Sequence, residues 1–199
     1  MASNDYIYKM SNAGGMSTVQ RYTDMLAGNP VFVPTSFESI QTVTVGSGGQ
    51  TTISFTSIPS TYKHLQIRGT WANAGTSQYA SIRFNGDTSS NYAYHDFYGD
   101  GANVYTEAVS STTGIGMAYS SSTTSYTGFV YDILDYTSTT KNKTIRGIEG
   151  RDTNGGGAIA LHSGLWFKTP EAISSIDIYV STTNNIKQYS SFALYGIKG

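Results

Sequence analysis

The clearest hydrophobic pattern in the chain lies between residues 126 and 167, where Gly128–Tyr136 and Gly157–Phe167 are joined by the more polar Lys141–Asp152. In the second segment one alternating row is Ile159, Leu161, Ser163, Leu165 and Phe167, and the other is Ala158, Ala160, His162, Gly164 and Trp166. Period two is the strand period, because successive side chains leave opposite faces of a pleated backbone. The first segment is apolar on both faces, which is typical of a strand buried between layers. This block is therefore predicted to form the centre of an all-β body, with Leu161 in its core.

Further strands are predicted on both sides of this centre. They are Thr42–Val45, Thr51–Phe55, Lys63–Trp71, Tyr79–Phe84, Tyr92–Tyr98, Thr113–Tyr119, Ile173–Val180 and Tyr189–Ile197. In the third of these, Leu65, Ile67 and Trp71 take inward positions. Residues 46–49 predict a hairpin between the strands that flank them, and residues 85–87 are another turn signal. About ten strands at spacings of roughly 8–15 residues favour a two-sheet antiparallel β-sandwich of jelly-roll-like topology.

Residues 1–34 differ from this body and predict an extended arm that contains one short helix. A capping box at 17–20 begins the helix, and Gly28 followed by Pro30 ends it. Such a short helix is marginal in water by itself, so its apolar face is expected to dock on a partner surface. The residues expected to bind that partner are Tyr8, Met10, Met16, Val19, Tyr22, Met25 and Leu26. The sequence thus predicts an anchoring arm over 1–34 and a β-sandwich body over 35–199.

The composition argues against several classes of protein, namely nucleic-acid-binding, disulfide-bonded and membrane-spanning ones. The 199 residues carry a formal net charge of −1 and only 13% are charged, so no clustered basic face for nucleic acid is expected. Cysteine is absent, which excludes disulfides and thiolate metal sites. No apolar run is long enough to span a membrane, and the first residues lack the features of a secretory signal. The 16 tyrosines and 22 glycines suit strands with polar outer faces and an adhesive surface.

Candidate chemistry is sparse. The three histidines, His64, His95 and His162, are not at ligand spacing, which favours structural roles over metal binding or catalysis. Three aspartates lie around turns: Asp87, Asp96 and Asp100. Such loops can hold Ca²⁺, but the spacing is not that of an EF-hand and turn formation is the favoured interpretation. The sequence predicts no catalytic residue, no cofactor and no metal site, and hence a non-enzymatic protein.

Five stretches of the chain resemble known proteins. They are Tyr8–Met16 (YKMSNAGGM), Arg21–Asn29 (RYTDMLAGN), Tyr62–Gly69 (YKHLQIRG), Ile82–Asp87 (IRFNGD) and Tyr189–Gly199 (YSSFALYGIKG). In these stretches the chain is similar to structural proteins of tailed bacteriophages, especially those of cyanobacterial and other aquatic phages, and the similarity extends over most of the chain. The motifs are more specific for virion proteins in general than for one part of the virion.

The resemblance implies a virion structural protein that is made in the host cytoplasm and has no catalytic residues to carry over. The favoured role is a capsid decoration (cement) protein on the outer surface of the capsid. Its arm would bind the major capsid protein or another virion protein and stabilise the shell. Symmetric lattice positions imply a homo-oligomer, with a trimer favoured. The alternative is a tail or fibre component whose β-sandwich binds host glycans through exposed Tyr and Trp. Neither role involves nucleic acid or a membrane.

Overall fold

The computed structural model describes residues 26–27, 36–75, 78–120, 124–180 and 185–199. The chain divides into two compact units, Met1–Ser36 and Phe37–Gly199. Six of the predicted arm residues lie outside the described residues: Tyr8, Met10, Met16, Val19, Tyr22 and Met25. Leu26 is described and its side chain is 68% exposed. The arm boundary at residues 34–35 and the partner-binding role of these residues stay predictions.

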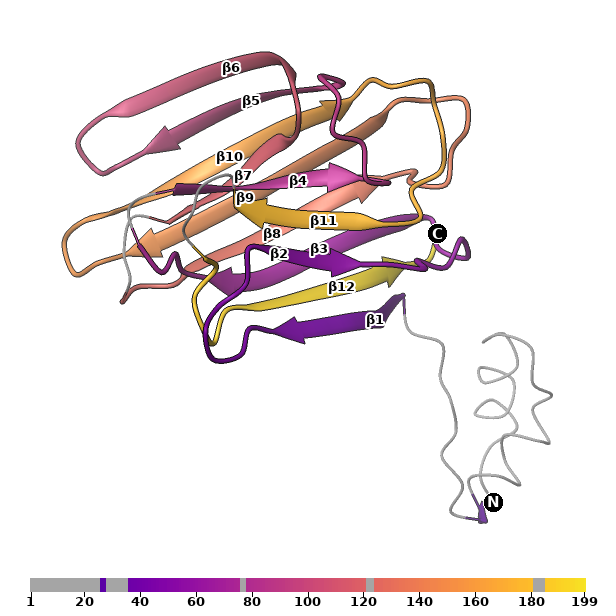
Figure 1. The fold of residues 1–199 in the computed structure, drawn as a ribbon, viewed down its shortest axis with the longest axis horizontal. Coiled ribbons are helices and arrows are strands. Elements are labelled where there is room, and N and C mark those ends of the chain that lie inside the picture. The colour runs from indigo at the N-terminus through magenta and orange to yellow at the C-terminus, as the bar shows by residue number, and fades with distance from the viewer. Residues whose placement is uncertain (1–25, 28–35, 76–77, 121–123, 181–184) are drawn as a thin grey trace, which may run out of the picture. The chain divides into compact units, whose positions relative to one another are not determined.

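The body is a sandwich of two antiparallel sheets (Figure 1). Its described strands are β1 (Phe37–Thr44), β2 (Thr52–Phe55), β3 (His64–Trp71), β4 (Gln78–Phe84), β5 (Tyr92–Gly99), β6 (Val104–Thr112), β7 (Ile115–Ser120), β8 (Thr127–Leu134), β9 (Lys143–Asp152), β10 (Gly157–Trp166), β11 (Ile176–Val180) and β12 (Ser191–Ile197). The large sheet has eight strands in the order β1-β12-β3-β8-β9-β10-β5-β6. The small sheet has four in the order β2-β11-β4-β7. The predicted all-β sandwich is confirmed.

The core lies between the sheets and is built from the inward rows of alternating strands. In β3 the side chains of Leu65, Ile67 and Trp71 are fully buried, as their alternation predicts. The small sheet supplies matching apolar rows, such as Ile176 and Ile178 of β11, and all five residues belong to one hydrophobic cluster. Burial of apolar area on this scale is the main favourable term in the folding of such a body.

The hairpin predicted across residues 46–49 is wrong, whereas the turn predicted at 85–87 is confirmed. Asn85 and Gly86 both have positive φ, and the backbone N–H of Asp87 donates to the carbonyl of Phe84. After this turn the chain crosses the sandwich, because β4 belongs to the small sheet and β5 to the large one. β1 and β2 are separated in the same way. A turn signal shows where the chain reverses, but the pairing partner of each strand depends on which sheet can bury its apolar row.

The sequence also missed β6 and β9. The inward row of β9 contains Lys143, Glu149 and Arg151, so polar residues stand on both faces and hide the strand period. β6 is an edge strand of the large sheet and nearly all of its side chains are exposed. Alternation marks a strand only when one face is apolar and buried, and neither strand meets that condition along its whole length.

The predicted burial of Leu161 is wrong, because the other row of β10 faces the small sheet. Leu161 is 49% exposed, whereas Trp166 is buried and its ring stacks on that of Tyr92. A Cβ placed on Gly164 would lie 2.5 Å from Ile115 of β7, which shows how closely the small sheet approaches this row. Both rows of β10 carry apolar residues, so alternation by itself does not identify the inner one. Within the described residues no helix is long and apolar enough to cross a membrane.

Truncation of a side chain is expected to reduce stability strongly on the inner face of the large sheet and only weakly on its outer face. Trp71→Ala is expected to lower the free energy of unfolding by about 3–5 kcal/mol, because it leaves a cavity in the core. Leu161→Ala is expected to cost about 1 kcal/mol or less, because its side chain is half exposed. Chemical denaturation of both variants checks this, and equal losses would contradict the assignment of the inner row.

Candidate functional site

A cavity of about 410 Å³ opens between the two sheets, within the size range of roughly 300–1,000 Å³ typical of small-molecule sites. We call it the tyrosine cleft. It is lined by Tyr79, Asp96, Tyr98, Asp100, Tyr105, Tyr119, Glu149, Arg151, Ala158, Ala160 and His162. The large sheet contributes residues from β5, β6, β9 and β10, and the small sheet contributes one tyrosine each from β4 and β7. The cleft therefore depends on how the two sheets pack.

Small residues on β10 make room for the cavity. Ala160 is paired across the sheet with Tyr98 of β5 on one side and with Glu149 of β9 on the other. Side chains directly opposite on antiparallel strands share a face, so the long side chains of Tyr98 and Glu149 stand on either side of a methyl group. Ala158, two residues earlier, continues the same floor. A strip of alanines between longer side chains thus forms a trough on the inner face of the large sheet.

Four tyrosines form the walls of the cleft in two pairs. The rings of Tyr98 and Tyr105, which are cross-strand partners on β5 and β6, are stacked with centroids 4.7 Å apart. The rings of Tyr79 and Tyr119 on the small sheet are also 4.7 Å apart, at an interplanar angle of 48°. Tyr79 and Tyr105 remain 38% and 40% exposed. Rings held in place by a neighbouring ring, yet open to solvent, can offer an apolar surface and a hydroxyl to a ligand.

A buried acid–imidazole cluster lies at the bottom of the cleft. Nδ1 of His162 is 3.9 Å from Oδ2 of Asp96, and Nε2 is 3.7 Å from Oε1 of Glu149. The three side chains are only 3–5% exposed. Among the residues that the structure describes, Oδ1 of Asp96 and both nitrogens of His162 have no hydrogen-bond partner. Buried polar atoms are normally paired, so these three atoms have unused capacity to bind a ligand.

Burial sets the protonation of both acids. Loss of water raises the pKa of the Asp96 carboxyl above its ordinary value, while the neighbouring His162 acts in the opposite direction. Burial likewise raises the pKa of Glu149, again opposed by His162. The second carboxylate oxygen of Glu149 accepts a hydrogen bond of 2.8 Å from the backbone N–H of Tyr119. Glu149 therefore ties the large sheet to β7 and also contributes an acid to the cleft.

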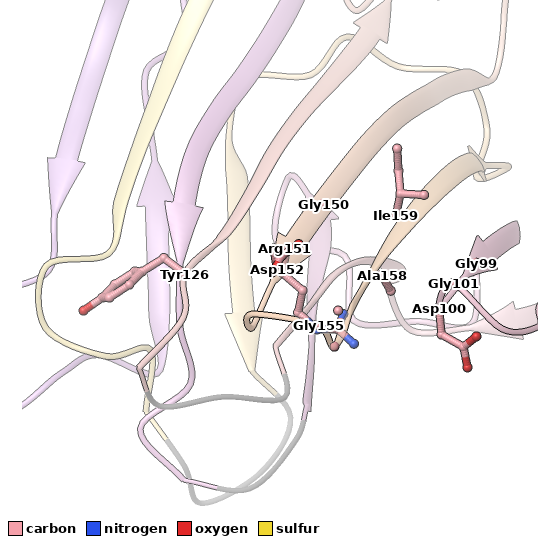
Figure 2. Close-up of a pocket in the computed structure, with 12 residues that line it drawn as sticks. Gly99, Asp100, Gly101, Tyr126, Gly150, Arg151, Asp152, Gly155, Ala158 and Ile159 are labelled. Carbon is pink, nitrogen blue, oxygen red and sulfur yellow. The ribbon is translucent and has the colours of Figure 1, made fainter.

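A wider depression of about 660 Å³ joins the cleft at one end of the sheet and shares Asp100, Arg151 and Ala158 with it. Figure 2 shows Ala158 between Arg151 on one side and Asp100 on the other, while Ile159 points the opposite way. The guanidinium of Arg151 lies 4.7 Å from the ring centroid of Tyr119, a cation–π contact at the rim. The cleft is thus open at an end that the glycine-rich segment Gly155–Gly157 borders.

The residues singled out from the sequence divide between structural and cleft positions. Asp96, Asp100 and His162 come together in the cleft. Asp87 lies elsewhere, and its carboxylate accepts hydrogen bonds from Trp166 Nε1 and from Asn91. His64 accepts a hydrogen bond from the backbone N–H of Asp135, a structural role. No group of three or more His, Asp or Glu side chains in the described part of the chain is placed to hold a metal ion.

Exposed tyrosines are expected from the sequence to bind glycans, but the sequence does not identify which tyrosines do so, and it does not identify Glu149 or Arg151 as site residues. A weak signal was present at the end of Lys143–Asp152, where Glu149 and Arg151 are two residues apart and precede a strand with Ala158 and Ala160 at alternate positions. Sixteen tyrosines spread over the chain hide the four that meet, since their meeting depends on sheet order. Comparisons with family models, with curated protein sequences and with solved structures find no match for this chain.

The buried acid of the cleft should reduce stability at neutral pH. The pKa of Asp96 is raised in the folded state, so the folded protein binds more protons than the unfolded chain above the ordinary aspartate pKa. Stability therefore falls as pH rises from that value through the raised pKa. Asp96→Asn is expected to raise the melting temperature by a few degrees at neutral pH and by less near pH 4.

Asp100→Asn is the matched control, and it is expected to change the melting temperature in the opposite direction. Hydrogen bonds from the backbone N–H groups of Asn103 and Ala102 lower the pKa of Asp100, so its charge favours the folded state at neutral pH. This variant is expected to lower the melting temperature at neutral pH and to lose that effect in acid. Thermal melts across pH check both variants, and destabilisation by Asp96→Asn at neutral pH would contradict the assignment.

Proposed function

We propose that this chain is a non-enzymatic structural protein of a tailed-bacteriophage virion and that its β-sandwich binds a glycan in the tyrosine cleft. The observation that carries the binding role is the cleft itself, with four tyrosines above a buried cluster of polar atoms that lack partners. The virion role is supported by the sequence resemblance in five stretches of the chain. Together they favour the host-recognition alternative, in which the protein is a tail or fibre component.

A sugar ring fits the chemistry of this cleft. Its C–H faces are apolar and can lie against tyrosine rings such as those of Tyr98 and Tyr105, which are already stacked on each other. Its hydroxyl groups both donate and accept hydrogen bonds, so they can pair with Asp96 Oδ1 and with the nitrogens of His162. The open end beside Arg151 and Asp100 leaves room for a chain of sugars to continue out of the cleft.

Capsid decoration is the second candidate, and the uncovered face of the large sheet favours it. A cross-strand row of Val130, Ile148, Leu161 and Phe97 runs over β8, β9, β10 and β5 on that face. The last three residues are 44%, 49% and 46% exposed. A contiguous exposed apolar patch marks an interaction surface. It could contact the major capsid protein or a neighbouring copy in the expected trimer on the outer surface of the capsid.

The two candidates differ in the number of copies per virion. A decoration protein covers a lattice and is present in hundreds of copies, whereas a tail or fibre component is present in few. Quantitative mass spectrometry of purified virions, scaled to the major capsid protein, therefore separates them. A lattice-scale copy number would favour decoration, and a small one would favour host recognition.

The binding role predicts that removal of a cleft tyrosine abolishes glycan binding without unfolding the body. Tyr105→Ala removes a 40% exposed ring, so little core is lost, but one face of the site disappears. Loss of one stacking ring is expected to weaken binding at least tenfold. Tyr189→Ala is the control, because Tyr189 is 70% exposed and does not line the cleft. A glycan array followed by calorimetry checks this, and equal binding by both variants would rule out the cleft.

The predicted anchoring role of the arm is tested by deletion of residues 1–34. The described core lies within Phe37–Gly199, so the truncated protein is expected to remain folded and soluble. It is expected to fail to attach to its virion, because the arm is the proposed anchor. Incorporation is measured by adding tagged protein to particles that lack their own copies. Full occupancy by the truncated protein would show that the arm is not the anchor.

A further inference from the structure

The tyrosine cleft is lined by more acidic than basic side chains. Three carboxylates, those of Asp96, Asp100 and Glu149, line it against the single guanidinium of Arg151. The two buried ones flank His162 on either side at 3.9 and 3.7 Å. A buried carboxylate is costly unless its charge is offset, and burial raises the pKa of both acids although His162, and for Glu149 also Arg151, act in the opposite direction. A positively charged ligand group would offset this cost, whereas a neutral one would not.

The walls of the cleft also favour a cation. Tyrosine rings carry negative charge on their faces, so a cation above a ring is attracted to it. The protein already places a cation against this wall, because the guanidinium of Arg151 lies 4.7 Å from the ring centroid of Tyr119. This contact occupies one ring at the rim. The stacked pair of Tyr98 and Tyr105 on the opposite sheet remains for a ligand.

The hydrogen-bonding capacity at the bottom of the cleft also favours a cationic ligand group. An ionised carboxylate accepts hydrogen bonds only, and an ammonium group donates three and accepts none. Oδ1 of Asp96 is an acceptor with no partner among the described side chains and backbone groups. Hydrogen bonds between ionised partners are roughly twice as strong as those between neutral ones. An ammonium group therefore uses this site better than a sugar hydroxyl does.

We propose that the tyrosine cleft selects glycans that carry a protonated amino group, namely amino sugars whose amine is not acetylated. The ammonium group pairs with Asp96 and Glu149 at the bottom of the cleft, and the sugar ring lies against the tyrosines. This proposal rests on the proposed glycan-binding function and specifies the class of sugar.

Selectivity of this kind is linked to pH. The titratable side chains that face Asp96 and Glu149 come from several elements. They are His95, His162, Arg151, Tyr79, Tyr94 and Tyr131, and Glu107 contacts Asp96 through its backbone. Acid protonates both carboxylates, which removes the negative charge that a bound cation would pair with. Affinity for a cationic ligand is therefore expected to fall as pH falls through the raised pKa values of the two acids.

The test compares three tetrasaccharides that differ only at position 2 of each ring: β-1,4-linked glucosamine, N-acetylglucosamine and glucose. Calorimetry with the full-length chain near neutral pH is expected to show at least tenfold tighter binding of the glucosamine chain. Equal or tighter binding of the neutral chains would overturn the amino-sugar proposal and leave the glycan-binding function standing.

Choline serves as a fourth probe, because its positive charge does not depend on pH. Binding of choline without binding of any tetrasaccharide would contradict the glycan-binding function and, with it, the amino-sugar assignment. Choline has no N–H to donate to Asp96, so the expected result is that it binds more weakly than the glucosamine chain and that acid weakens both in parallel. If no probe binds, both proposals fail.

Three variants place the selectivity in the cleft. Asp96→Asn is expected to remove most of the tenfold preference for glucosamine, and Arg151→Gln is expected to increase it severalfold, because a competing cation is lost. Asp177→Asn removes a carboxylate on β11 that does not line the cleft and is the matched control, with no expected change. The opposite effects at Asp96 and Arg151 distinguish charge recognition from unfolding. A preference unchanged in both variants would overturn the proposal.

Discussion

The structure depends on the packing of an eight-stranded sheet against a four-stranded one. A sheet must bury its apolar face against another layer, and the smaller sheet covers only part of the larger one. Where it does so, the inner face carries large apolar side chains such as Trp71, Tyr131 and Trp166. Toward one end of β5, β9 and β10 the inner face is instead polar, with Asp96, Glu149 and His162. The tyrosine cleft lies where the apolar core gives way to this polar end.

Glu149 connects stability and binding at this point. One of its oxygens holds the backbone of Tyr119 and so fixes β7 against the large sheet, while the other faces His162. Polar groups that are buried without full pairing are expected at functional sites rather than in a core optimised for stability. The same region therefore fixes the position of the small sheet and leaves polar atoms that have no partner among the described residues available to a ligand.

The body has two surfaces with different chemistry, and they suit different parts of the proposed virion role. The cleft is concave, aromatic and acidic, which suits a small charged ligand. The outer face of the large sheet is open and carries the apolar row of Ile148, Leu161 and Phe97, which suits a protein surface. Residues 1–34, the predicted arm, differ in composition from the body. Attachment and recognition can therefore reside on separate parts of one chain.

The sequence by itself determined the fold class and most of the strands, because period-two alternation depends only on local backbone geometry. It also identified the inner row of β3 and the turn at Asn85–Gly86. Tertiary structure decided the rest: which strands pair, which row of β10 is buried, and that β6 and β9 exist. It also brought four tyrosines from four strands to one cavity. These features depend on contacts between residues far apart in the chain, which local pattern does not encode.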